Sequence, residues 1–265
     1  MRVIAAEVFH FHDVCYLCAG PRKQGKHKLR SRADSASLMK RLAFGLLLIL
    51  VTPACGGHDA SPSATTSATT SNALVRPVGF DLDFWNEFVH GTHDNALPVP
   101  LRRRTTAPVV YIRTLDDDGV AVDPVTMSAV EQNFRDVALI WGGGSIGLAG
   151  VVRDPASHDG QPGTLNVHWS STAVLGNVCA KSDVGVDGGR IAFNYHGASP
   201  DCSCNGLVVS PRVAKHELGH AFGYWHTTTH VDDLMNPILT CDANPSDRER
   251  LHAAYAYTLP NGFTN

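Results

Sequence analysis

One short segment, residues 216–226, decides how this 265-residue chain is interpreted. It reads His216-Glu217-Leu218-Gly219-His220-Ala221-Phe222-Gly223-Tyr224-Trp225-His226. If the segment starts as a helix, His216 and His220 lie on one face, one turn apart, where two imidazoles can bind the same metal ion. Gly223 can adopt the left-handed conformation that ends a helix, so the chain can turn back and present His226 as a third ligand. Zinc with three protein ligands keeps its fourth position for water, which is typical of a catalytic site.

Glu217 is the candidate general base of this site. It directly follows the first candidate ligand. A carboxylate there can reach a zinc-bound water without binding the metal itself. A bare His-Glu-x-x-His pattern also arises by chance on amphipathic helices, but Gly223 and His226 fix two further positions and weaken that explanation.

A methionine supports the same interpretation. Met235 follows His226 by nine residues, within Asp232-Asp233-Leu234-Met235-Asn236-Pro237. An extended zinc motif followed by a methionine turn resembles the metzincin metalloproteases, and the matrixin-like branch most closely. The resemblance implies that His216, His220 and His226 bind zinc, that Glu217 activates water, and that Met235 forms a hydrophobic floor beneath the metal.

Some positions depart from that family. Asn236 and Pro237 stand where astacins and serralysins carry a zinc-binding tyrosine, and Thr227, after the third histidine, is closest to the serine of matrixins. No segment matches the structural-zinc and calcium region of matrixins. The aspartates at 116–118, 183 and 187 lie in turn-like loops, where the alternatives are a calcium site and ordinary solvated turns, and the solvated turns are favoured.

The resemblance implies an α+β catalytic domain with a twisted, mostly parallel sheet, long helices, a zinc helix at the cleft and a C-terminal helix. Apolar runs predict strands at 109–112, 148–152, 165–169 and 190–195, and the last of these is the expected edge strand for an extended substrate. A Ser128-x-x-Glu131 capping box would begin a helix whose apolar stripe is Val130, Phe134, Val137 and Trp141.

Two further helix starts are predicted. Ser210 and Pro211 supply an N-cap and a first-turn proline for the zinc helix, whose buried side would carry Val213, Ala214, Leu218, Ala221 and Phe222. Ser246-x-x-Glu249 would cap the last helix, with Leu251, Ala254 and Tyr255 as its apolar residues.

Residues 39–55 are typical of an export signal. A short basic start at Met39 precedes an apolar run at 42–51 that is too short to span a bilayer, and Cys55 follows a small alanine as in a bacterial lipobox. Thr52 stands where that pattern usually has leucine, so the alternatives are lipidation of Cys55 and plain secretion. The protein is therefore expected to be exported, as a surface or outer-membrane lipoprotein or in secreted form, and residues 1–38 are not expected in the mature chain.

The rest of the chain divides by composition. Residues 56–73 are rich in Ser, Thr, Ala and Gly and predict a disordered linker. Residues 74–106 form an N-terminal extension with apolar residues at helical spacing, and 107–265 form the metalloprotease domain. In the extension, the histidines at 90 and 93 are expected at the surface rather than over the metal, and the arginines at 102–104 in a solvated linker rather than a processing site.

Past Cys55 the chain has four cysteines. An even number in an exported protein predicts two disulfides. Cys202 and Cys204 are too close to pair with each other comfortably, so each is expected to bridge to Cys179 or Cys241. Two pairings remain open on the sequence.

The sequence therefore predicts a zinc-dependent endopeptidase acting on protein or peptide substrates. The net charge is −3, and the excess of basic residues near the N-terminus leaves the remaining chain mildly acidic, which argues against nucleic acid as a partner. Membrane contact is expected only through lipidated Cys55, and a monomer is the default. The alternatives are a surface-anchored zinc-containing binding module without turnover and a hydrolase of non-peptide amides.

Overall fold

The computed structural model describes residues 75–264, apart from 198–199, 238–240 and 242–243. The predicted export signal, the lipobox-like Cys55, the linker and residues 1–38 lie outside the described residues. None of the described helices is long and apolar enough to cross a membrane.

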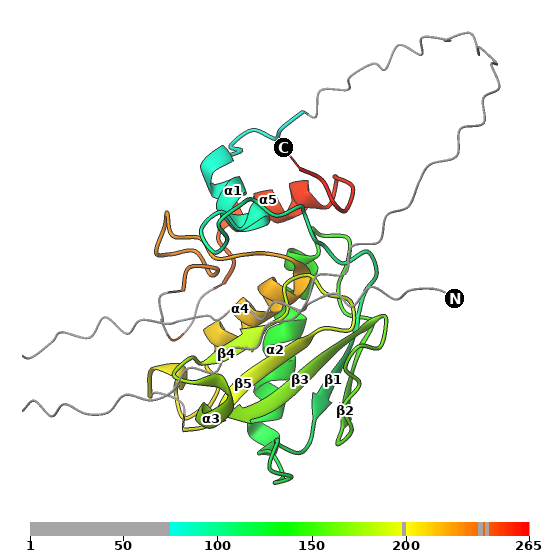
Figure 1. The fold of residues 1–265 in the computed structure, drawn as a ribbon, viewed down its shortest axis with the longest axis vertical. Coiled ribbons are helices and arrows are strands. Elements are labelled where there is room, and N and C mark those ends of the chain that lie inside the picture. Colours follow the sequence, from blue (N-terminus) through cyan, green and yellow to red (C-terminus); the bar gives the residue numbers. More distant parts are fainter. Residues whose placement is uncertain (1–74, 198–199, 238–240, 242–243, 265) are drawn as a thin grey trace, which may run out of the picture. The chain divides into compact units, whose positions relative to one another are not determined.

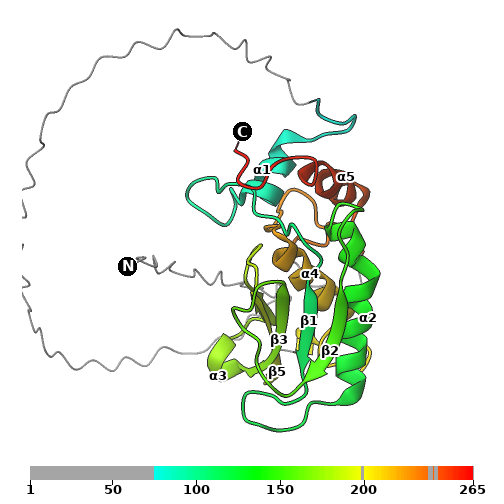
Figure 2. The ribbon, with the colours of Figure 1, turned by 90° about the vertical axis from the view of Figure 1, so that its right-hand side faces the viewer.

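A five-stranded, mostly parallel sheet forms the centre of the described chain (Figures 1 and 2). Its strands are β1 (Val109–Arg113), β2 (Gly150–Asp154), β3 (Thr164–Ser171), β4 (Ala180–Ser182) and β5 (Arg190–His196). The order across the sheet is β2-β1-β3-β5-β4, and only β4 runs antiparallel to its neighbour. All four predicted strands are present. The predicted edge strand is wrong, because β5 lies between β3 and β4 and the short β4 occupies that edge.

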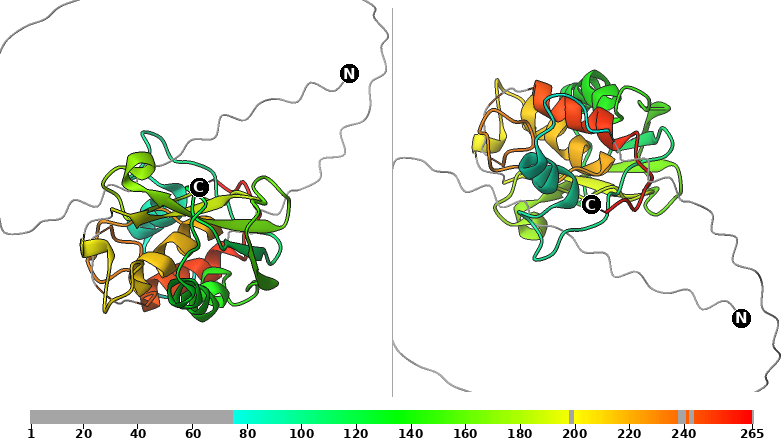
Figure 3. Two further views of the ribbon diagram at one scale, coloured as in Figure 1. Left: turned by 90° about the horizontal axis from the view of Figure 1, so that it is seen from below. Right: turned by 90° about the horizontal axis from the view of Figure 1, so that it is seen from above.

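Helices α2 (Pro124–Trp141), α4 (Pro211–Phe222) and α5 (Asp247–Ala256) gather on one side of the sheet (Figure 3). The predicted stripe of α2 is buried. The predicted capping box of α2 is wrong, because Asp123 is the N-cap and accepts hydrogen bonds from the backbone N–H groups of Val125 and Thr126. Asp123 is followed by a proline at the first helical position, which favours a start there. Ser128 lies inside the helix, and its hydroxyl donates to the carbonyl of Pro124.

The ends of α4 follow the prediction. Ser210 caps its first turn by accepting from the N–H of Val213, and Gly223 ends it in the left-handed region with φ 113°. The capping box of α5, Ser246 with Glu249, is also present. Of the apolar residues predicted for α5, Tyr255 packs against the core and Leu251 is half-buried, whereas Ala254 is exposed. The buried residues of the helix are Glu249, His252, Ala253 and Ala256, because the first two find hydrogen-bond partners inside the protein.

The N-terminal extension packs into the same hydrophobic core as the rest of the described chain. Its helix α1 (Leu82–His90) buries the aromatic residues that the spacing predicted and lies beside α5, where Phe84 contacts His252 edge-on (Figure 1). Arg104 is buried, and its guanidinium donates to the carbonyls of Ala221, Thr164 and Val186. The predicted solvated linker is therefore wrong for Arg104, which joins α4 to the sheet.

Both disulfides predicted from the cysteine count are present, and the structure selects one pairing. Cys179 pairs with Cys202, and Cys204 pairs with Cys241. They tie the loop before α4 to β4 on one side and to the chain after Met235 on the other. Disulfides are typical of proteins outside the reducing cytoplasm.

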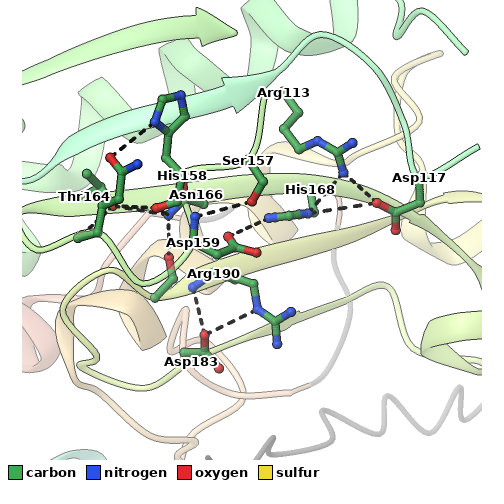
Figure 4. Close-up of polar contacts among 12 residues, drawn as sticks. Arg113, Asp117, Ser157, His158, Asp159, Thr164, Asn166, His168, Asp183 and Arg190 are labelled. Carbon is green, nitrogen blue, oxygen red and sulfur yellow. Dashed lines mark hydrogen bonds and ion pairs between the residues drawn. The ribbon is translucent and has the colours of Figure 1, made fainter. Parts of the chain in front are cut away.

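Four of the aspartates named as calcium candidates make side-chain contacts within the protein: Asp116, Asp117, Asp183 and Asp187. Figure 4 shows Asp117 paired with Arg113, and Asp183 accepting from the backbone N–H of Arg190, whose side-chain Nε lies 3.8 Å from the same carboxylate as an ion pair. Asp116 accepts from the N–H groups of Asp118 and Val120, and lies 2.7 Å from His196 Nε2. These loops therefore give no support to a calcium site. Two short elements complete the described chain: helix α3 (Thr172–Leu175) and the 3₁₀ turn η1 (Pro200–Cys202).

Candidate metal centre

The structure brings the three predicted ligands into one buried cluster. His216 and His220 lie one turn apart on α4, and His226 returns to them after the chain reverses at Gly223. One nitrogen atom of each lies within 4.8 Å of the others, and among the described residues no other group of histidines, cysteines and carboxylates could hold a metal in this way. The three ring centroids are 4.7–5.3 Å apart.

Each of the three rings is oriented through its Nδ1 atom. His216 Nδ1 donates to the carbonyl of Leu234 at 2.7 Å, and His220 Nδ1 donates to the carbonyl of Tyr224 at 2.7 Å. His226 Nδ1 lies 2.9 Å from a carboxylate oxygen of Asp94. A hydrogen on Nδ1 leaves the lone pair on Nε2 in a neutral imidazole. Burial, with the neighbouring imidazoles, also holds the pKa of His216 well below its usual value, which favours the neutral ring.

The spacing of one pair of Nε2 atoms, those of His220 and His226, fits a zinc ion. His220 Nε2 and His226 Nε2 are 3.2 Å apart. With both Nδ1 atoms protonated, two lone pairs would face each other at that distance, which is repulsive unless a cation lies between them. Two ligands at about 2.0–2.1 Å from a tetrahedral zinc are about 3.3 Å apart, close to the observed spacing. The donor set of three neutral imidazoles also suits zinc, so the residues present fit the group.

Glu217 is fully buried on α4, between the ligand His216 and the core residue Leu218. Neither of its carboxylate oxygens has a hydrogen-bond partner among the described residues. Burial raises the pKa of Glu217 to about 8. A carboxyl group without a partner is costly to bury, and a nearby cation would favour its ionised form. This is the environment expected of a functional group rather than a structural one.

The turn that contains Met235 packs directly against α4. Met235 is fully buried, and a Cβ atom added to Gly219 would lie 2.5 Å from its sulfur. Glycine at position 219 of the motif therefore makes room for Met235 beneath the helix. The backbone N–H of Thr227 donates to the carbonyl of Met235, which joins the residue after the third ligand to the same turn.

A buried carboxylate from α5 holds the methionine turn in place. Glu249 accepts hydrogen bonds from the backbone N–H groups of Leu234, Met235 and Ser246 at 3.0, 2.7 and 2.6 Å. Burial raises the pKa of Glu249 to about 7, against the opposing effect of these three donors. Because the carbonyl of Leu234 also accepts a hydrogen bond from His216 Nδ1, Glu249 is connected through one residue to the first candidate ligand. Sequence reasoning identified Glu249 only as a helix cap.

Asp94 was also missed by sequence reasoning. It lies in the N-terminal extension, 132 positions before His226. Burial would raise the pKa of Asp94, but its hydrogen bonds to His226 outweigh this effect and the pKa falls below its usual value. The two histidines of the extension are not in the cluster: His90 is buried with its Nδ1 2.7 Å from the carbonyl of Val99, contrary to the surface position expected for it, and His93 is exposed. No local pattern marks Asp94, because its partner lies far away in the sequence.

Comparisons with known proteins add little to this geometry. No protein-family model matches the sequence, and no curated protein matches it. Among the 45 chains of solved structures that match is metalloproteinase-II from Bacteroides fragilis, at 11% identity and a TM-score of 0.34. The alignment covers 58% of this chain and 56% of that one, so the chain spans little more than half of the matched protein. A TM-score of this size is too low to support inferences about fold or activity.

Proposed function

We propose that this protein is a zinc-dependent endopeptidase. The observation that carries the proposal is the buried cluster of three imidazoles, each oriented through Nδ1 and with donor atoms within 4.8 Å of one another, together with a buried carboxyl group, on the same helix as two of them, that has no hydrogen-bond partner among the described residues. A structural zinc usually has four protein ligands, whereas three ligands and a free carboxylate favour catalysis. The assignment to the matrixin-like branch of the metzincins is part of the proposal and rests on the sequence resemblance.

Each residue of the candidate site would have a separate role in peptide hydrolysis. His216, His220 and His226 would hold the ion, with their Nδ1 partners fixing each ring. When bound, zinc would polarise the substrate carbonyl and lower the pKa of a water in its fourth position to about 7. Glu217 takes the proton of the attacking water and passes it to the departing amine. Met235 supplies a packed apolar floor that keeps the zinc helix rigid.

An extended substrate would bind along β4, the strand at the edge of the sheet next to β5. Main-chain hydrogen bonds to an exposed edge are a common way of holding an extended peptide. The chain just after β4 lies against the zinc helix, because the N–H of Gly185 donates to the carbonyl of His220. The residues at 236–239 would border the pocket for the side chain after the cleaved bond, although 238 and 239 lie outside the described residues.

The expected setting is outside the cytoplasm. The two disulfides agree with export. Anchoring through lipidated Cys55, a monomeric state and the lack of a nucleic-acid partner are proposals carried over from the sequence.

Removal of the metal tests the proposed activity. Incubation of the purified protein with 1,10-phenanthroline should remove the zinc and reduce cleavage of a diverse peptide mixture to background. Among the described residues, no other cluster could hold a metal ion and sustain the activity. Addition of zinc after removal of the chelator should restore cleavage, whereas magnesium or calcium should not. The measurement is mass spectrometry of the products.

Three results would count against the proposal. Cleavage that survives the chelator would exclude a metal mechanism. A zinc-loaded protein that cleaves no peptide would favour the binding module, and hydrolysis confined to small non-peptide amides would favour the third alternative.

A further inference from the structure

The third proposed ligand, His226, differs from His216 and His220 in the partner of its Nδ1 atom. His216 and His220 are fixed by α4, and their Nδ1 atoms donate to backbone carbonyls. His226 follows the helix in an irregular segment, and its Nδ1 partner is the Asp94 carboxylate. Its ring is therefore held by a side chain that lies 132 positions earlier in the chain.

Asp94 holds both the ring and the backbone of His226. Its Oδ1 lies 2.9 Å from Nδ1, and its Oδ2 accepts the backbone N–H at 3.0 Å. The Asp94 side chain is 15% exposed, so little water competes for these bonds. A carboxylate in this position fixes the tautomer and the orientation of a ligating imidazole and makes it a stronger donor to metal.

The segment of the extension that contains Asp94 also contacts the residues on both sides of His226. The ring of Phe88, on α1, stacks on Tyr224 with centroids 4.3 Å apart and planes inclined by 5°, and the carbonyl of Phe88 accepts the N–H of Trp225 at 2.8 Å. Beyond the ligand, Glu87 accepts the backbone N–H of Thr228 at 2.8 Å. Contacts before, at and after the third ligand therefore come from one continuous stretch, 87–94.

We propose that Asp94 is a positioning residue for the third zinc ligand, and that the stretch 87–94 is a working part of the metal centre rather than a separable leader. This inference rests on the proposed zinc site. It predicts that the affinity for metal depends on a residue that touches neither the ion nor the substrate.

The test measures metal affinity without any substrate. Zinc binding by the full protein is measured by competition with a chromophoric chelator, for the wild type, Asp94→Ala, Asp94→Asn and the control Asp83→Ala. Asp83 is an exposed aspartate of the same extension, so its removal makes the same change of charge away from the ligand. Loss of the Asp94 carboxylate should weaken zinc binding by about 10- to 100-fold. Asp94→Asn should lose less, because an amide oxygen can still accept from Nδ1, and Asp83→Ala should match the wild type.

A second readout separates positioning from general loss of structure. In the cobalt-substituted protein, the visible absorption bands should shift in Asp94→Ala and move part of the way back in Asp94→Asn, since they report the geometry of the ligands. If both Asp94 variants bind zinc as tightly as the wild type and give its cobalt spectrum, the inference is wrong. If the wild type itself binds no zinc, the proposed function fails instead, so the two failures are distinct.

Discussion

Glu217→Gln should bind zinc as tightly as the wild type and lower kcat/KM for peptide hydrolysis by about 10²- to 10⁴-fold, the range expected when a general acid–base group is removed. The amide keeps the shape of the side chain but cannot accept the proton of the attacking water. Because the carboxyl oxygens of Glu217 have no partner in the folded protein, the substitution should not lower the free energy of unfolding of the metal-free protein. A large loss of activity without loss of stability is the signature of a group retained for chemistry.

The control for this prediction is the same Glu→Gln substitution at a glutamate away from the candidate site. Glu131 on α2 pairs with Arg135 and Arg153 at the surface, and Glu131→Gln should leave hydrolysis unchanged. Steady-state kinetics on one fluorogenic peptide, with zinc content measured on the same samples, give both quantities. Hydrolysis by Glu217→Gln at the wild-type rate, with a full complement of zinc, would refute the assigned role.

The second large effect is expected at Gly223, where Gly223→Ala should lower the free energy of unfolding by more than about 3 kcal/mol, in the range of strongly destabilising substitutions. Two costs combine. The residue has φ 113°, which L side chains rarely adopt, and a Cβ atom there would overlap the backbone carbonyl oxygen of Arg102. Relief of that overlap would separate the end of the zinc helix from the extension and displace His226, so zinc affinity should also fall.

Gly119→Ala is the matched control for this second prediction. Gly119 has φ 80°, but a Cβ atom there would meet no atom within 4 Å. This variant should therefore lose only the backbone cost of about 1–2 kcal/mol and should keep its zinc affinity. Urea unfolding of both variants measures the difference. If the two substitutions cost the same, contact between Gly223 and Arg102 does not constrain the site.

Local signals in the sequence account for much of the fold and for the core of the site. The spacing of His216 and His220, the cap at Ser210 and the glycine at 223 act within one or two turns, so they can be interpreted without knowledge of the fold. Apolar runs likewise located β1, β3 and β5. The start of α2 was missed although a local signal existed, because Asp123 with Pro124 caps the helix in place of Ser128, five residues after Asp123.

Contacts between distant parts of the chain could not be predicted in this way. Asp94 meets His226 across 132 positions, and Arg104 reaches Ala221 across 117. The position of β4 at the sheet edge depends on how the strands assemble, and the disulfide pairing depends on where the loops come together. In a sequence, such buried polar residues cannot be distinguished from surface residues. The partner whose hydrogen bonds offset the cost of burial lies far away in the chain, so no neighbouring residue indicates it.

The central claim is that three imidazoles hold one catalytic zinc ion. X-ray absorption spectroscopy at the zinc edge, combined with metal analysis of the same purified protein, tests it most directly. The account predicts one zinc per chain with a first shell of three nitrogen atoms and one oxygen atom at about 2.0–2.2 Å. A well-folded protein that takes up no zinc, or a zinc bound by four protein ligands, would contradict it.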